Sequence, residues 1–249
     1  MRHVQPGGDG DHRAHRWPRS QEETIQLQHR LAGARPPPWH PAAGVPLIGA
    51  CYVCFARGRP GRGEEGESAW AAAALCRGTR FEMAVAVEGR AGAAYVPGLM
   101  AAREGPVLQS AVEALPRPDV LIVNATGRDH PRRAGLAVHL GAVLDLPSVG
   151  VTDRCLTAEG GAPGLQRWSA SPMTIGDEEV AAALRTRASA RPVIVHPGWA
   201  TELSTALLVV RLATRRARTP EPLRRARRLA RLVRAGRAGA GEVLVRGEL

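Results

Sequence analysis

The chain has 249 residues, of which 44% are hydrophobic and 4% aromatic, and it carries a formal net charge of +11 with a pI near 11.1. This length and hydrophobic content suffice for one α/β domain with a real core. No run of about 18 apolar residues is present, which excludes a membrane span, and the basic N-terminus lacks the apolar stretch of a signal peptide, so we expect a cytoplasmic protein.

The positive charge comes entirely from arginine, apart from the histidines. Clustered arginines neutralise phosphates and supply the electrostatic part of nucleic-acid binding. A GC-rich coding bias, which favours Ala, Arg, Gly and Pro together, accounts for the same composition. The charge therefore favours a nucleic-acid partner over a purely compositional origin without deciding between them.

The four cysteines do not form a secreted disulfide framework at this chain length. Cys51 and Cys54 have CxxC spacing, but they fall in an apolar run, residues 45–55, that predicts a buried strand. Residues three apart on a strand point to opposite faces of the sheet. We therefore favour core cysteines over a redox or zinc site.

The first part of the chain is predicted to be a disordered basic tail followed by one short helix. Residues 1–19 are rich in Arg, His, Gly and Pro, a composition typical of disorder. Ser20 and Glu23 have the spacing of a capping box, so a helix is expected to begin there and to end near Leu31. The Pro-rich residues 34–44 predict an extended connector.

Three strands and a helix are predicted next. The strands are expected at residues 45–55, 68–76 and 81–89, and the polar residues 57–66 are interpreted as a hairpin tip rather than a site. Pro97 and Gly98 break the chain, after which a helix is expected at residues 104–115.

Residues 120–152 predict a β-α-β unit. Residues 120–123 read VLIV, a fully apolar, β-branched run typical of a central parallel strand. A helical period follows at 134–146 and a second strand at 147–152. The polar loop between them leaves the carboxyl end of a strand, the edge where open α/β sheets place ligands.

The remaining residues predict a Gly-rich excursion at 157–176, a strand at 192–198 and a helix capped by Thr201. A basic amphipathic helix is expected from Leu223. Its charges are interpreted as a solvated face rather than as a groove reader. We expect one domain at residues 20–235 and a flexible C-terminus at 236–249.

The order of short motifs along the chain resembles that of the endonuclease V family. The motifs are YVPG (95–98), REGP (103–106), the segment RPDVLIVNATGRDHPRRAGLAVHLG (117–141), LPSVGVT (146–152), VHPG (195–198) and PEPLRRARRLAR (220–231). The resemblance spans about residues 20–232, and its central segment is far more specific than any single short motif.

The resemblance implies a ribonuclease H-like fold, in which helices flank a mixed sheet. We also expect a monomer. The resemblance also implies an endonuclease that depends on Mg²⁺ or Mn²⁺ and cleaves DNA or RNA near deaminated bases such as inosine. In the family, carboxylates hold the metal against the scissile phosphate, a nearby histidine assists, and the YVPG segment acts as a wedge beside a pocket for the flipped base.

Transferred to this sequence, the resemblance assigns catalytic roles to Glu104, Asn124 and His130, with Glu104 as a metal ligand and Asn124 as a weak one. Tyr95, Pro97 and Gly98 correspond to the wedge. Four arginines near the same loop edge are candidates for contact with the nucleic-acid backbone, with solvated surface charge as the open alternative: Arg103, Arg128, Arg132 and Arg133.

Two of the three metal-binding carboxylates of the family are replaced here. The strand-end Asp is Asn124, and the first-strand Asp falls at Cys51, or at Tyr52 if the alignment slips by one residue. The other departures replace a Lys, a His and a late Asp of the family with Asp153, Trp199 and Arg227.

These replacements predict a large loss of metal affinity, because Mg²⁺ prefers anionic oxygens and a carboxamide offers one neutral carbonyl. Glu82, Asp129 or Asp153 would have to move in to restore the site. Asp129 is the best candidate, although an Asx turn or a helix cap before Pro131 accounts for it equally well.

Three hypotheses follow from the sequence. The chain is an active endonuclease with a rebuilt metal site, a catalytically inactive family member that still binds nucleic acid, or a fold reused for protein partners. The first two differ in whether carboxylates converge near Glu104, and the third predicts no salt-sensitive binding of inosine-containing strands.

Overall fold

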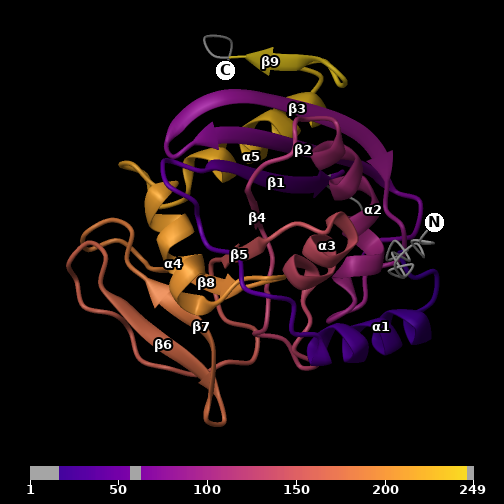
Figure 1. The fold of residues 1–249 in the computed structure, drawn as a ribbon. Helices are drawn as coiled ribbons and strands as arrows, with labels where there is room; N and C mark the ends of the chain where they lie inside the picture. The colour runs from indigo at the N-terminus through magenta and orange to yellow at the C-terminus, as the bar shows by residue number, and fades with distance from the viewer. Residues whose placement is uncertain (1–16, 57–62, 246–249) are drawn as a thin grey trace, which may run out of the picture.

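The computed structural model describes residues 17–56 and 63–245. Nearly all of the expected disordered tail and most of the expected hairpin tip at 57–66 therefore lie outside the described residues. Within these residues the chain forms one mixed sheet of nine strands with helices on both faces (Figure 1). The predicted α/β class is confirmed.

The strands lie in the order β6-β7-β8-β5-β4-β1-β2-β3-β9. Their bounds are β1 Leu47–Phe55, β2 Ser68–Arg77, β3 Arg80–Arg90, β4 Val120–Val123, β5 Ser148–Thr152, β6 Ala170–Ile175, β7 Glu178–Leu184, β8 Val193–Pro197 and β9 Val243–Val245. Strands β1, β4 and β5 are parallel, and the other pairs are antiparallel.

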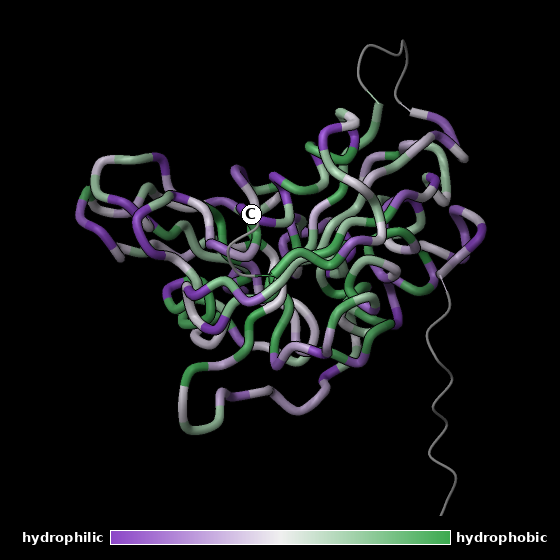
Figure 2. The backbone as a smooth tube through the Cα atoms, turned by 90° about the horizontal axis from the view of Figure 1, so that it is seen from above, coloured by the Kyte–Doolittle hydropathy of each residue, from purple (hydrophilic) through white to green (hydrophobic). Residues whose placement is uncertain are grey.

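The helices are α1 Gln21–Gly33, α2 Met100–Glu113, α3 Leu136–Leu144, α4 Leu203–Leu212 and α5 Glu221–Arg234. Helices α2 and α3 cover one face of the sheet, and α4 and α5 cover the other. Both faces of the central strands are therefore buried, which explains why these strands are apolar throughout. Figure 2 shows hydrophobic stretches running through the middle of the molecule and most of the hydrophilic stretches at its periphery.

The predicted β-α-β unit is confirmed. Strand β4 pairs in parallel with β5, and α3 connects them. Strand β4 also pairs in parallel with β1, so that Val123 lies opposite Cys51. Strand β4 therefore ends opposite the middle of β1, and the loop after Val123 opens at this point of the sheet.

The cysteine prediction is confirmed as well. Cys51 and Cys54 lie on β1 and are both buried. Cys51 packs in the cluster on the α2 side of the sheet, whereas Cys54 packs in the cluster against α5. Two thiols on opposite faces cannot share a metal ion.

The C-terminal half differs from expectation in three places. Residues 170–184, of which 170–176 were assigned to a Gly-rich excursion, form the β6-β7 hairpin, and residues 243–245 pair with β3 at the edge of the sheet. Thr201 does not cap α4, because Glu202 is the residue at the helix start and the Thr201 hydroxyl donates to the carbonyl of Ser148 at 2.6 Å.

The capping box before α1 forms in part. The Ser20 hydroxyl accepts a hydrogen bond from the Glu23 N–H at 3.1 Å, as predicted, whereas the Glu23 carboxylate accepts from the N–H of Arg19 instead of Ser20. Among the described residues, no helix has both the length and the apolar character needed to cross a bilayer.

Candidate functional site

A pocket of about 280 Å³ lies at the carboxyl ends of β4 and β5, between the segment 95–98, the start of α2 and the loop that follows β4. It is lined by residues from five parts of the chain: Gln28, Tyr95, Pro97, Gly98, Met100, Ala101, Glu104, Asn124, Ala125, Thr126, His130, Leu136, Thr152 and Leu156. Six residues that the sequence assigned to the site thus share one cavity.

The segment Tyr95–Gly98 is fixed to the rest of the site through one carbonyl group. The carbonyl oxygen of Gly98 lies within hydrogen-bonding distance of Gln28 Nε2 at 2.8 Å, His130 Nε2 at 3.0 Å and Arg132 Nη2 at 3.3 Å. Gly98 has φ +78°, a conformation that favours glycine. Tyr95 remains 39% exposed, so it projects from an anchored turn and does not pack in the core.

His130 serves this anchor. Its Nδ1 accepts the backbone N–H of Arg132 at 3.1 Å, so the proton lies on Nε2, which donates to Gly98. The ring is buried, and burial lowers its pKa, which favours the neutral form. The sequence assigned His130 to a phosphate, but in this arrangement neither ring nitrogen is free to contact one.

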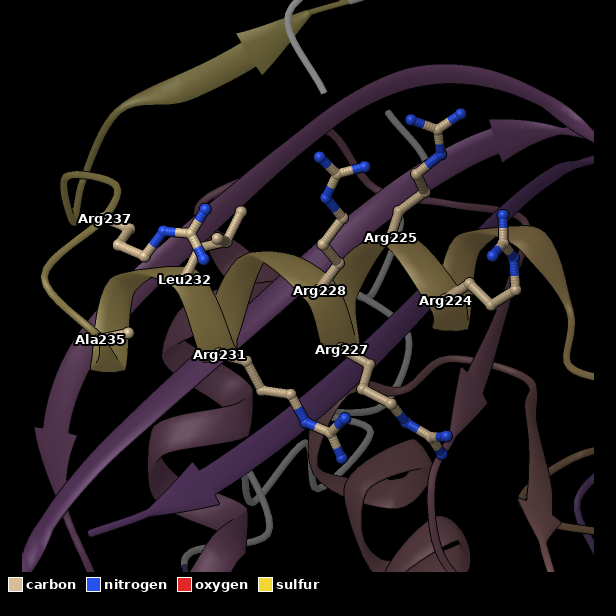
Figure 3. A pocket seen from close by; sticks show the side chains of 8 residues that line it. All are labelled: Arg224, Arg225, Arg227, Arg228, Arg231, Leu232, Ala235 and Arg237. Carbon is tan, nitrogen blue, oxygen red and sulfur yellow. The ribbon is translucent and has the colours of Figure 1, made fainter. Parts of the chain in front are cut away.

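Asn124, at the end of β4, forms a hydrogen bond with the residue that replaces the family's late aspartate. Arg227 Nη2 donates to Asn124 Oδ1 at 2.8 Å. The Arg227 guanidinium also lies 5.3 Å from the centre of the Tyr52 ring, a distance typical of cation–π contact. Figure 3 shows Arg227 and Arg231 extending from the same side of α5, away from Arg225 and Arg228.

Glu104 faces the same region from α2, on the other face of the sheet. Burial raises its pKa to about 7, and the positive charge of Arg103 offsets only part of this shift. Cys51 is near enough for the Glu104 charge to add to the effect of burial, and the pKa of its thiol is strongly raised. At neutral pH the Glu104 carboxyl is therefore about half protonated, and the Cys51 thiol is protonated.

The raised pKa of Glu104 makes stability depend on pH. Since the folded state favours the protonated carboxyl, the penalty is absent below its unfolded pKa of 4.5, grows as the pH rises to about 7 and stays constant above that. We expect Glu104→Gln to raise the free energy of unfolding by up to about 3 kcal/mol at about pH 9 and to change it little at about pH 4.

Thermal melts at both pH values measure this difference. Glu113→Gln is a suitable control, because Glu113 is exposed at the other end of α2 and its replacement should have a similar small effect at both pH values. An equal effect of Glu104→Gln at both pH values would contradict the burial argument.

Asp129 is not directed at the pocket, which corrects the expectation that it could restore the metal site. It is fully buried, and its carboxylate accepts hydrogen bonds from the N–H groups of Leu156, Thr157 and Ala158 at 2.7–2.8 Å and from the Thr157 hydroxyl at 3.0 Å. These bonds hold the loop after β5. Because these partners lie 27–29 residues further along the chain, they form neither an Asx turn nor a helix cap before Pro131, and Asp129 instead ties two loops together.

Arg103 is a second correction. Its side chain is 3% exposed, forms an ion pair with Glu67, donates to the carbonyls of Glu64 and Ala93, and stacks over Phe55 at 4.3 Å. A guanidinium enclosed in this way has no access to a phosphate. Its function is to connect α2 to the segments on either side of it.

The other three arginines are only partly exposed, and each contacts another segment. Arg128 donates to the carbonyl of Ala32, in the last turn of α1, and to that of Ala34, just after the helix. Arg132 contacts Gln28 and Gly98, and Arg133 forms an ion pair with Glu178 at 3.1 Å. The polar crowding after β4 is therefore largely a set of ties between the loop and its neighbours.

Gln28 and Thr152 are two of the pocket residues that sequence reasoning missed. Gln28 lies on α1, 70 residues before the carbonyl that it contacts, and no local pattern marks it. Thr152 also lines the pocket, and its hydroxyl is 2.8 Å from Nε2 of the buried His196. The VHPG motif contained a signal for His196, but its partner depends on the pairing of β5 with β8.

A mixed sheet of this order, with helices on both faces and a pocket at the ends of its central parallel strands, defines a ribonuclease H-like protein. The sequence matches the family model for Endonuclease V over residues 46–228. The chain belongs to the endonuclease V family, which comprises nucleases of nucleic-acid repair.

Individual relatives agree with this assignment. The endonuclease V of Streptomyces avermitilis is 36% identical over 225 residues, 86% of this chain and 93% of that protein. A crystal structure from the same species superposes with a TM-score of 0.76 at 33% identity, covering 89% of this chain and 96% of that one.

Other relatives match over a shorter length. The Methanothrix thermoacetophila endonuclease V is 45% identical over 130 residues, 52% of this chain and 58% of that protein. A Ciona intestinalis endonuclease V, solved in complex with a 24mer DNA that contains an inosine followed by a ribo-adenosine, shares the fold at a TM-score of 0.72 and 20% identity, covering 86% of this chain and 98% of that one.

The family implies a divalent metal ion, and the residues present here do not fit one. The strand-end position offers the carbonyl of Asn124, which already accepts from Arg227, and a cation beside a guanidinium is repelled. Glu104 is the single carboxylate lining the pocket. In the part of the chain that the structure describes, no group of three His, Cys, Asp or Glu side chains could hold a metal.

Proposed function

We propose that this chain binds a DNA or RNA strand and takes one flipped base, with inosine and other deaminated bases as the first candidates, into the pocket behind Tyr95. We further propose that it does not cleave the strand by metal-dependent hydrolysis. The observation that carries the proposal is the pocket itself, in which an exposed aromatic wedge is anchored next to a cavity with both apolar and polar walls.

The pocket suits a planar, polar ring. Its volume of about 280 Å³ lies near the lower end of the range for small-ligand sites. Met100 and Leu136 provide apolar surface, while Asn124 and Thr126 provide polar groups that could pair with the edge of a base. Tyr95 is exposed and would stack against a neighbouring base.

The wedge is rigid enough to separate bases. Gln28, His130 and Arg132 hold the carbonyl of Gly98 from two different elements. A wedge that is fixed in advance loses little conformational entropy on binding. The partly exposed Arg128, Arg132 and Arg133 remain candidates for contact with the strand backbone beside it.

Two other functions follow from the sequence. An active enzyme with a rebuilt metal site would need a second carboxylate near Glu104, and Asp129 is engaged in four hydrogen bonds elsewhere. A role in protein binding would leave the wedge and the net charge of +11 without a use. No observation supports either of these functions as strongly as the pocket supports base binding.

The test is fluorescence anisotropy with single-stranded DNA and RNA that carry one inosine, compared with unmodified strands over a range of salt concentrations. We expect binding that weakens steeply with salt and prefers the inosine strand. Tyr95→Ala should weaken binding by roughly tenfold through the loss of stacking, with little change in melting temperature because Tyr95 is exposed.

Leu208→Ala is the control, because Leu208 is an equally exposed hydrophobic residue on α4, outside the pocket lining. Absence of salt-sensitive binding to any strand would reject the proposal and favour a protein partner. Cleavage of the inosine strand in Mg²⁺ or Mn²⁺, abolished by Glu104→Gln, would show that the chain is an active nuclease.

A further inference from the structure

Three positions at which this sequence departs from the family pattern contact one another. Asn124 replaces the strand-end aspartate, Arg227 replaces the late aspartate, and Tyr52 occupies the alternative position of the first-strand aspartate. In the structure, Arg227 donates to Asn124 at 2.8 Å and lies over the ring of Tyr52 at 5.3 Å. The replacements therefore form one connected group.

This group reverses the polarity of the site. An aspartate at position 124 would offer acceptor oxygens only, which attract a cation. The carboxamide of Asn124 turns its one oxygen to Arg227, because a guanidinium can only donate. The Nδ2 amide group of Asn124 is then left as a donor that Arg227 does not use. Asn124 itself lines the pocket.

Most donors of this group have no acceptor among the described residues. Asn124 accounts for one of the five N–H groups of Arg227, and no other hydrogen bond joins either side chain to the described residues. The Nε of Arg227 is buried without an acceptor, a state that is costly unless the guanidinium gains something else. Free donors next to a fixed positive charge are the features of an oxyanion site.

Arg227 also joins the base pocket to the basic surface of α5. It is one of the arginines that line the hollow along this helix, together with Arg224, Arg228 and Arg231 (Figure 3). Its hydrogen bond to Asn124 brings it to the edge of the pocket at the end of β4. If a nucleic-acid strand places one base in the pocket, its sugar-phosphate backbone would run past Arg227.

We infer that Arg227 and Asn124 bind a phosphate of the nucleic-acid backbone in the place where the family holds a divalent metal ion, so that strand binding by this protein needs no metal. The inference rests on the proposed function, since it requires a bound strand. It assigns Arg227 a direct contact with the ligand. In the sequence, Arg227 was noted only as the residue that replaces an aspartate of the family.

The first experiment measures strand binding by anisotropy in excess EDTA and in Mg²⁺ or Mn²⁺. We expect affinities that agree within about twofold in the wild type. Arg227→Gln should weaken binding by roughly tenfold. Arg216→Gln is the matched control, because Arg216 is exposed and lines neither the hollow nor the pocket, and its loss removes the same charge; its effect should stay within about twofold.

The second experiment needs no nucleic acid. Mn²⁺ binding is followed by electron paramagnetic resonance in the wild type and in the double variant Asn124→Asp, Arg227→Gln. We expect no stoichiometric Mn²⁺ binding in the wild type. The double variant should bind Mn²⁺ at least about tenfold more tightly than the wild type, because it combines two carboxylates and removes the competing cation.

The outcomes separate the two proposals. A wild type that binds no strand rejects the proposed function and the phosphate contact with it, while the Mn²⁺ measurement still decides whether a metal belongs here. If strands bind but EDTA abolishes binding, or if the wild type takes up one Mn²⁺ that Glu104→Gln removes, the inference is wrong. Equal losses in Arg227→Gln and Arg216→Gln would likewise overturn it.

Discussion

Arg103→Met is expected to lower the free energy of unfolding by about 4 kcal/mol, a loss of roughly 10 °C in melting temperature for a chain of this size. The substitution leaves the Glu67 carboxylate, itself 9% exposed, without its cation. It also removes the donors to the carbonyls of Glu64 and Ala93. A buried charge without a partner is among the most destabilising changes in a protein.

The double variant Arg103→Met, Glu67→Leu should recover much of this loss, because it removes both charges together. Arg80→Met is the control for an exposed pair: Arg80 contacts Glu82 at 2.6 Å but is 55% exposed, and its loss should cost less than about 1 kcal/mol. If Arg103→Met melted like the wild type and lost only strand binding, the original assignment of Arg103 to the nucleic-acid backbone would be correct.

Asp129→Asn is expected to lower the free energy of unfolding by about 3 kcal/mol. The amide nitrogen would face the N–H of Leu156 or that of Thr157, so at least one buried donor loses its acceptor. The pKa of Asp129 is lowered by these backbone N–H groups and the charge of His196, although burial alone would raise it. The stabilisation is therefore present above the unfolded pKa and disappears as the pH falls through the folded one.

Thermal melts near neutral pH and in acid test this prediction. The difference between Asp129→Asn and the wild type should be large near neutral pH and should shrink in acid, where the wild-type carboxylate becomes protonated. Asp153→Asn is the control, because Asp153 is 63% exposed and pairs with Arg218 at the surface. An unchanged melting temperature combined with weaker Mn²⁺ binding would instead identify Asp129 as a metal ligand.

Both residues show how a sequence pattern can identify a neighbourhood without identifying a role. Arg103 and Asp129 stand one position away from Glu104 and His130, which line the pocket. A helix turns each residue by about 100° from the last, so Glu104 faces the site and Arg103 faces Glu67. In the loop, Asp129 turns inward to three backbone N–H groups while His130 reaches Gly98.

The sequence alone determined the class of the fold, the β-α-β unit and the edge of the sheet at which the pocket opens. These follow from local features: the apolar run at 120–123, the helical period after it and the polar loop between them. The burial of Cys51 and Cys54 on opposite faces followed from the two-residue repeat of a strand. Family membership followed from the order of the motifs, which spans most of the chain.

Only the tertiary structure decided which polar groups are free. Residues 178–184, with the Ala-rich sequence EEVAAAL, become a strand because β6 pairs along them and β8 pairs with their last three residues, and Gln28 enters the site because α1 packs against α3. Arg227 meets Asn124 across 103 residues of sequence. The sequence lists every one of these residues, but it does not show which of them are in contact. Hydrogen bonds and burial depend on distances in space, which a linear pattern does not contain.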